Sequence, residues 1–197
     1  MCQPCLRFSE KFVYRKIAIL NSLNELSNFD EQLTLLQNKV KIPRPDLDSF
    51  KKIIYDHLTA ALVSHFPHSM IHFFGSRVTD LDIHDSDLNI YVDNTDSQLA
   101  TLECIKELIE RSEFFERVSL CLDGDSPVVK FEHKKTKIFC QVSIKNELPV
   151  GNTELIKFYL MLDEKLKPLI VLIKFWLDCC GLRHENGLSS YAICLMV

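Results

Sequence analysis

The sequence has little glycine and proline, no long apolar run, and no excess of positive charge. Its 197 residues include only 5 glycines and 7 prolines, which excludes collagen-like and low-complexity chains. The longest apolar stretch, 168–177, contains Lys174 and is too short to cross a bilayer, so no membrane partner is expected. The 23 Lys+Arg against 27 Asp+Glu give a net charge of −4, which argues against a nucleic-acid binder that relies on a generally positive surface.

The cysteines lack the pattern of a disulfide-rich secreted protein. The N-terminal segment MCQPCLRFSEKF has no apolar run typical of a signal peptide, so the 8 cysteines are expected to be free thiols in a reducing compartment. The pair Cys2 and Cys5 has the spacing of half a zinc site, but no second Cys or His pair follows at zinc-finger spacing. We therefore expect an untethered N-terminal tail and a cytoplasmic location.

The spacing of apolar residues predicts helices at both ends and a β-rich middle. Helical spacing covers 9–26 and 30–40, and it resumes over 46–65 after two prolines, with Asp46 as the expected N-cap. From residue 152 the spacing is helical again, with expected breaks at Pro168 and at 180–181. Between these ends we predict one helix, 98–112, and strands 70–74, 87–92, 117–122, 128–132 and 137–144.

This order predicts an α+β fold, in which a sheet domain is flanked by helical segments from both ends of the chain. The last segment, 188–197, is apolar on nearly all sides and has no C-terminal cap. We expect either that the chain is a fragment of a longer protein or that a partner covers this helix. A second copy of the chain is the simplest symmetric partner, and the N-terminal helices are the competing intramolecular cover.

The run that carries chemistry lies between residues 73 and 92. A predicted strand ends at Gly75-Ser76, where a small residue lets backbone N–H groups and a hydroxyl approach a triphosphate. Eleven residues after Ser76, Asp87 opens the next strand as Asp87-x-Asn89. Alternate residues on a strand point to one face, so a pair at this spacing suits the metal ions of a phosphoryl-transfer site.

These segments resemble the DNA polymerase β-type nucleotidyltransferases, whose pattern is FGS, a spacer and SDL-x-I. Later segments make the chain similar to terminal uridylyltransferases and cytoplasmic poly(A) polymerases: QVSIKN at 141–146, NT at 152–153, LKPLIVLIKFW at 166–176 and GLSSYA at 187–192. The resemblance implies a polymerase β-like mixed sheet with helices. It also implies a nucleotidyltransferase-like domain over 45–146, an N-terminal helical segment over 1–44, and part of a helical central domain over 147–197.

The resemblance also implies roles for individual residues. Gly75 and Ser76 would meet the triphosphate, and Asp87 would be the first metal-binding aspartate. The remaining implied roles are ribose recognition by Asn152 and Thr153 with Asn146 nearby, phosphate contacts by Lys174 and Ser190, and base stacking by Tyr191. The alternative is that Tyr191 is a core aromatic and that Lys174 extends past an apolar surface to solvent.

Four departures from the family pattern all point away from catalysis. The second metal-binding aspartate is Asn89, and the third carboxylate, which would also be the general base, is Gln141. Neutral amides are weak ligands for hard cations, and glutamine takes no proton. Asp80 stands at a family glycine and Asp178 at a second phosphate-binding lysine, so two acids are expected to face the phosphates. A shifted pair of Asp85 and Asp87, with Asp82 nearby, is the only rescue that the sequence offers.

The function that follows is a catalytically inactive homologue of the terminal RNA nucleotidyltransferases, a regulatory module in RNA 3′-end metabolism. Its candidate partners are RNA, a protein or a second copy bound through the apolar helical ends, and no cofactor is expected. Two alternatives stay open. One is an active RNA uridylyl- or adenylyltransferase with an atypical Mg²⁺ or Mn²⁺ site, and the other is an inactive homologue that still binds a nucleotide.

Overall fold

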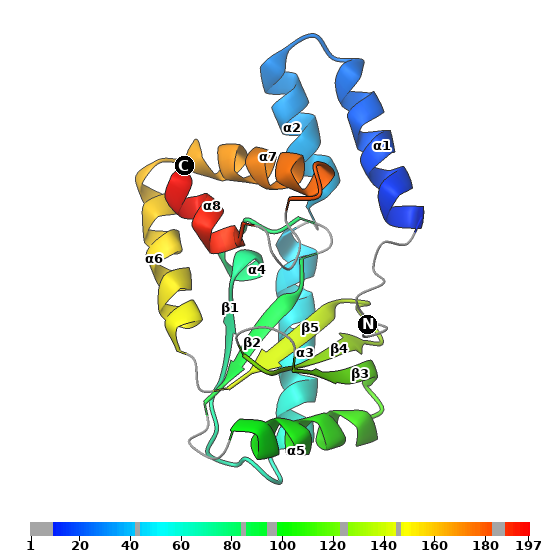
Figure 1. Cartoon of the computed structure of the whole chain (residues 1–197), viewed down its shortest axis with the longest axis vertical. Helices are drawn as coiled ribbons and strands as arrows, with labels where there is room; N and C mark the ends of the chain where they lie inside the picture. Colours follow the sequence, from blue (N-terminus) through cyan, green and yellow to red (C-terminus); the bar gives the residue numbers. More distant parts are fainter. Residues whose placement is uncertain are drawn as a thin grey trace.

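The computed structural model describes residues 10–41, 44–83, 86–93, 98–122, 126–144, 147–182 and 188–197 (Figure 1). A sheet with two long helices forms one part of the molecule, and helices from both ends of the chain form the other. None of the described helices combines the length and apolar character of a membrane span. The predicted zinc half-site, Cys2 and Cys5, lies outside the described residues.

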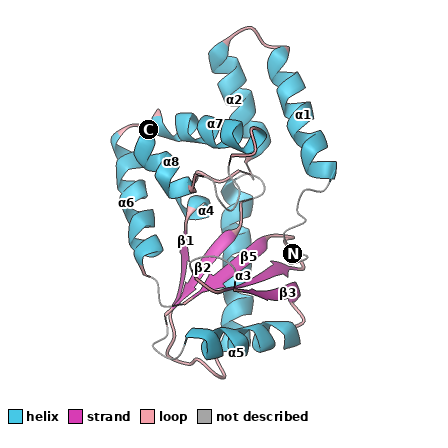
Figure 2. Ribbon diagram, viewed as in Figure 1, coloured by secondary structure: helices cyan, strands magenta, loops and turns pink. Residues whose placement is uncertain are grey.

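The sheet is mixed and has the strand order β1-β2-β5-β4-β3 (Figure 2). Strands β2 and β5 are parallel, and the other neighbouring pairs are antiparallel. The strands are β1 (Ile71–Phe74), β2 (Leu88–Val92), β3 (Phe115–Cys121), β4 (Val128–His133) and β5 (Phe139–Ser143). The predicted α+β class and the mixed sheet are confirmed, and all five strands lie where the alternation of apolar residues predicts them.

Eight helices are present in the described ranges. They are α1 (Glu10–Asn24), α2 (Phe29–Val40), α3 (Arg44–Leu62), α4 (Ser76–Thr79), α5 (Gln98–Arg111), α6 (Leu148–Leu162), α7 (Leu166–Cys179) and α8 (Ser190–Met196). Asn28 caps α2, since its side-chain oxygen accepts hydrogen bonds from the backbone N–H groups of Asp30 and Glu31. Ser189 caps α8 through its hydroxyl and the N–H of Ala192.

Two separate apolar cores explain the two parts of the molecule. The first lies between one face of the sheet and helices α3 and α5, and its buried residues include Leu58, Ile90, Ile105, Phe131 and Val142. The second joins both ends of the chain. Its members come from α1, α2, α6, α7, α8 and the loop after α4, and they include Ile19, Leu36, Leu81, Phe175 and Ile193. The helical part is therefore built from both ends, as predicted, while the exact domain boundaries stay a prediction.

Two helix starts differ from those predicted, whereas the break predicted at 180–181 is confirmed, since α7 ends at Cys179. Helix α7 begins at Leu166, so Pro168 lies in its first turn, where a missing N–H breaks no helical hydrogen bond. The break lies instead at 163–165, where the Asp163 carboxylate accepts a hydrogen bond from the N–H of Lys165 (2.8 Å). Similarly, α3 starts at Arg44, so Asp46 is a residue of the first turn and not the N-cap. Helix α6 starts at Leu148, with Pro149 in its first turn.

Candidate functional site

Gly75 forms the tight turn between β1 and the short helix α4. Its backbone has φ 80° and ψ −159°, a region that is essentially restricted to glycine. A Cβ atom at this position would lie 2.7 Å from Nδ2 of Asn89, so the side chain of Asn89 fills the space that the glycine leaves. The turn therefore brings the β1–α4 backbone against the residue that stands at the second metal-binding position.

Thr153 holds helix α6 against this turn. Its buried hydroxyl accepts a hydrogen bond from the N–H of Gly75 (2.8 Å) and donates one to the carbonyl of Pro149 (2.7 Å). Thr153 therefore has a structural role, since its hydroxyl joins α6 to the glycine turn, and its ribose contact stays a prediction. Asn152 is half-buried beside it, and Asn146 lies outside the described residues.

The polar face of the sheet carries the three positions that the family resemblance assigns to metal binding. Asn89 and Gln141 are register partners on the parallel strands β2 and β5, and Asp87 lies two residues before Asn89 on the same face. The residues next to them in sequence, Leu88, Ile90 and Val142, are buried in the first core on the opposite face. The three positions predicted from the sequence are therefore neighbours, and they comprise one carboxylate and two neutral amides.

This set of donors does not fit a divalent-metal site of phosphoryl transfer. Such sites bind Mg²⁺ or Mn²⁺ mainly through carboxylates, and here a single carboxylate, Asp87, stands beside two amides. Among the residues that the structure describes, no group of three or more His, Cys, Asp or Glu side chains is arranged to hold a metal ion.

The nearby acid Asp82 does not replace a lost metal ligand. Its carboxylate is buried and accepts a hydrogen bond from Nη1 of Arg77 (3.3 Å), whose Nε donates to the carbonyl of Ser86 (2.6 Å). Burial raises the pKa of Asp82, and the Arg77 guanidinium opposes that shift. Asp82 therefore belongs to a structural ion pair, while Asp85, which would form the shifted pair with Asp87, lies outside the described residues.

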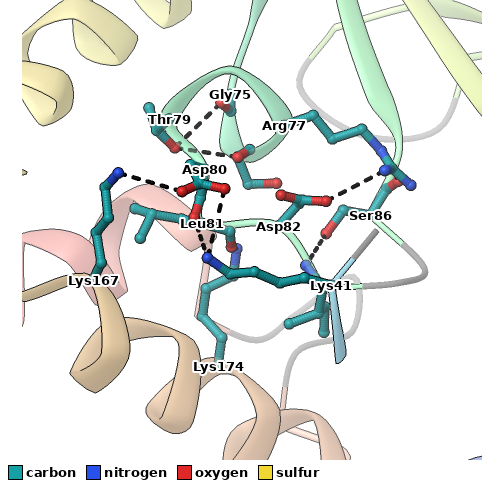
Figure 3. Close-up of polar contacts among 12 residues, drawn as sticks. Lys41, Gly75, Arg77, Thr79, Asp80, Leu81, Asp82, Ser86, Lys167 and Lys174 are labelled. Carbon is teal, nitrogen blue, oxygen red and sulfur yellow. Dashed lines mark hydrogen bonds and ion pairs between the residues drawn. The ribbon is translucent and has the colours of Figure 1, made fainter. Parts of the chain in front are cut away.

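The backbone conformation at Asp80 explains why the family pattern has a glycine at this position. Asp80 ends α4 with φ 62° and ψ 28°, the left-handed conformation that glycine adopts most easily and aspartate tolerates. Figure 3 shows the Asp80 carboxylate between two lysines: Nζ of Lys167 lies 3.3 Å from Oδ2 and Nζ of Lys41 lies 3.6 Å from Oδ1. Asp80 is thus paired with two cations, and its predicted place beside the phosphates of a nucleotide stays a prediction.

Asp178 is paired as well. Nζ of Lys16, on α1, lies 2.8 Å from Oδ2 of Asp178 and also donates to its backbone carbonyl. The two acids that depart from the family pattern therefore both bind lysines from the N-terminal helices, Lys41 after α2 and Lys16 on α1. The sequence analysis missed these lysines, because no local pattern links residues that lie 39 and 162 positions from their partners.

The remaining predicted residues surround this region from α7 and α8. Lys174 is fully buried, and its ammonium donates a hydrogen bond to the carbonyl of Leu81 (Figure 3). Ser190 and Tyr191 open α8, and Tyr191 packs against the second core. Helix α8 packs on α7, and burial raises the pKa of its Cys194, a shift that the charge of Lys174 opposes.

The mixed sheet, the glycine turn into a short helix and the polar face beside it define the polymerase β-type nucleotidyltransferase fold. The family model described as "Poly(A) RNA polymerase, mitochondrial-like, central palm domain" matches residues 29–161. The chain belongs to this family, and the sequence resemblance to terminal nucleotidyltransferases is confirmed.

Curated relatives agree with this assignment. Caffeine-induced protein 16 of Schizosaccharomyces pombe is 32% identical over 127 residues, which cover 63% of this chain and 10% of the relative. Terminal uridylyltransferase cid1 of the same organism is 27% identical over 205 residues, 98% of this chain and 48% of the relative. Poly(A) RNA polymerase gld-2 homolog A of Drosophila melanogaster is 28% identical over 134 residues, 66% of this chain and 10% of the relative. The chain thus spans at most about half the length of these three relatives.

Solved structures share the fold. The structure of mtPAP in complex with UTP superposes with a TM-score of 0.79 at 18% identity and covers 91% of this chain and 43% of the other. The GLD-2/RNP-8 complex gives a TM-score of 0.76 at 22% identity, with 84% of this chain and 54% of the other covered. At these identities the likeness concerns the fold.

Proposed function

We propose that this protein is a catalytically inactive member of the terminal nucleotidyltransferase class, acting in RNA 3′-end metabolism through bound partners. The observation that carries the proposal is the register of β2 and β5, which sets Asn89 beside Gln141 at the metal-binding positions. The chain keeps the family's sheet and its glycine turn. It lacks two of the three carboxylates that would hold the metal ions of nucleotidyl transfer.

Asn89 and Gln141 stand in place of groups with different roles in the reaction. Asn89 offers one neutral carbonyl oxygen where a charged carboxylate would hold a metal, and Gln141 does the same at the third position. Gln141 also has no basic oxygen to take the proton of an attacking RNA 3′-hydroxyl. A single remaining carboxylate, Asp87, supplies neither a two-metal clamp nor a general base.

A protein partner is supported by the surface of the helical part. Helix α6 exposes Leu148, Phe158, Met161 and Leu162 on the outside of the molecule, and α8 exposes Leu195 and Met196. Large apolar side chains exposed on a helix are typical of interaction sites when they gather on one surface. The structural neighbours GLD-2/RNP-8 and GLD-2/GLD-3 are complexes with other proteins. We place the module in the cytoplasm, in keeping with its free cysteines.

Primer extension tests the loss of activity. Purified protein, an RNA primer, each nucleoside triphosphate in turn and Mg²⁺ or Mn²⁺ are incubated, and terminal uridylyltransferase cid1 serves as the positive control. We expect no added nucleotide above the buffer control, since two of the three metal-binding carboxylates and the general base are absent. Incorporation that disappears in the Asp87→Ala variant would contradict the proposal, because it would show a working site built on that carboxylate.

A further inference from the structure

Helix α6 is apolar on two opposite faces, and the fold buries only one of them. The inner face contributes Ile156 and Leu160 to the second core. The outer face carries side chains that are 38–75% exposed at positions i, i+7, i+11 and i+14, which follow one line along a helix: Leu148, Leu155, Tyr159 and Leu162. We call these four residues the outer stripe, and α6 lies at the outside of the molecule (Figure 1). A helix that is apolar on all sides is typical of a buried position, so the outer stripe suits a partner.

Gly151 lies on the same side of α6, and nothing in the fold requires a glycine there. It is exposed, its φ is not in the left-handed region, and a Cβ atom at this position would meet nothing within 4 Å. Alanine would therefore fit and would favour the helix. The missing side chain leaves a gap between Leu148 and Leu155, and such a gap lets another backbone or a large side chain approach closely. The glycine is thus a second, independent sign of an occupant on this face.

The charges around the outer stripe indicate a basic occupant. Residues 147–165 contain four acids and two lysines, which gives a net charge of −2. The acids are all exposed: Glu147, Glu154, Asp163 and Glu164. A second copy would bring the same excess of acids against itself, and an anionic bilayer would be repelled, whereas a cationic partner is attracted.

We propose that the outer stripe of α6 binds a basic amphipathic α-helix of a partner protein, packed alongside α6. The inference rests on the proposed function, in which the protein acts through bound partners. Leu148, Leu155 and Leu162 recur every seven residues, which is the repeat of two helices that interlock along their length. The 15 residues of α6 span about 22 Å, so the partner helix needs about four turns. A large side chain of that helix fills the gap at Gly151, and its lysines or arginines face the acids of α6.

A designed peptide of about 21 residues serves as the probe, with leucine at heptad positions a and d and lysine at e and g. A matched peptide carries glutamate at e and g. Fluorescence anisotropy of each labelled peptide is measured against increasing protein. We expect the lysine peptide to bind about tenfold more tightly than the glutamate peptide, and added salt to reduce the difference. Leu155→Asn with Leu162→Asn is expected to weaken binding of the lysine peptide about tenfold, whereas Val63→Asn, at another exposed apolar position, leaves it unchanged.

Gly151→Ala separates close packing from general apolar adhesion. The variant is expected to bind the lysine peptide about fivefold more weakly, because the added methyl group fills the gap that the partner helix uses. Its midpoint of urea denaturation is expected to be no lower than that of the wild type, so the weaker binding does not come from unfolding.

Three results would overturn the inference: equal affinity for the two peptides, wild-type affinity in the Leu155→Asn and Leu162→Asn variant, or wild-type affinity in Gly151→Ala. Binding to phosphatidylserine vesicles in place of the lysine peptide, or a dimer that the double variant dissociates, would also overturn it, because the stripe would then belong to a bilayer or to a second copy. Primer extension tests the loss of catalysis separately, so the inference and the proposed function can fail independently.

Discussion

At the residue scale, Gly75 is the most constrained position of the site. An alanine there would be held at a φ of 80° and would place its Cβ 2.7 Å from Asn89. We expect Gly75→Ala to lower the free energy of unfolding by about 1–3 kcal/mol, as measured by urea denaturation. Gly151, which lies in helix α6, is the matched control, since a Cβ atom there would meet nothing within 4 Å.

For Gly151→Ala we expect a gain of about 0.5–1 kcal/mol, because alanine loses less backbone entropy in a helix. A Gly75→Ala protein as stable as the wild type would show that the turn relaxes freely. In that case the close approach of Gly75 to Asn89 would not fix the geometry of the polar face.

His133 makes the stability of the sheet domain depend on pH. It is fully buried, its Nε2 lies 2.9 Å from Nδ1 of His57, and its Nδ1 lies 2.9 Å from the hydroxyl of Thr136. Burial, together with the charge of His57, lowers the pKa of His133 from 6.5 to about 4. Between these values the unfolded chain binds a proton that the folded chain does not. Stability is therefore fully present above about pH 6.5 and falls as the pH approaches 4.

The expected loss from this one group is at most about 3 kcal/mol, from the size of the pKa shift. Urea denaturation at several pH values measures it. The His133→Asn variant is expected to show a shallower decline between pH 6.5 and 4, whereas His68→Asn, on an exposed position, retains the wild-type slope. Identical slopes for the wild type and His133→Asn would refute a titrating role for His133.

At the scale of elements, both apolar packing and an ion pair hold the N-terminal helices α1 and α2 against the rest of the molecule. Helix α2 packs on α7, and Lys16 and Asp178 form a half-buried ion pair between α1 and α7. We expect Asp178→Lys, the residue of the family pattern, to destabilise the protein by about 1–3 kcal/mol, because it opposes one ammonium to another. Hydrogen exchange in α1 is expected to speed up most.

The charge-swapped pair Lys16→Asp with Asp178→Lys is the control. It is expected to regain a large part of the stability, since it restores opposite charges at the same positions. If Asp178→Lys alone leaves both stability and exchange in α1 unchanged, the ion pair does not hold the hairpin.

Sequence periodicity predicted the helices and strands that have a long apolar stripe, because burial of that stripe determines them. It missed α4, whose four residues are too few to show a period, and it misread Pro168, since a proline in a first turn looks the same in sequence as a helix break. The resemblance located Asp87, Asn89 and Gln141, which the structure brings together. The lysines that pair with Asp80 and Asp178 were not predictable, because only the fold brings them near.

At the scale of the whole molecule, apolar side chains remain exposed on the helical part. In α8, Ile193 is buried in the second core while Leu195 and Met196 are exposed. The N-terminal helices contribute Ile19 and Leu36 to that core and leave these two residues uncovered. We therefore expect this chain to associate with itself through α8 at micromolar concentrations, and light scattering after size-exclusion chromatography measures the mass.

The variant Leu195→Glu with Met196→Glu is expected to shift the mass toward that of a monomer, since it places charges in the contact. Val63→Glu, on an exposed position after α3, serves as the control and is expected to behave as the wild type. A strictly monomeric wild type at several micromolar would show that this surface does not mediate self-association.

With two of the three metal-binding carboxylates replaced by amides, the site is expected to hold no metal ion, and a crystal soaked with UTP and Mn²⁺ tests this expectation. Mn²⁺ scatters anomalously, so a bound ion is located independently of the nucleotide. We expect no anomalous peak beside Asp87, Asn89 and Gln141 in the wild type, and a peak there in the Asn89→Asp and Gln141→Asp double variant. A Mn²⁺ ion coordinated by Asp87 in the wild-type crystal, with UTP phosphates bound to it, would show that the wild-type site still binds metal and nucleotide.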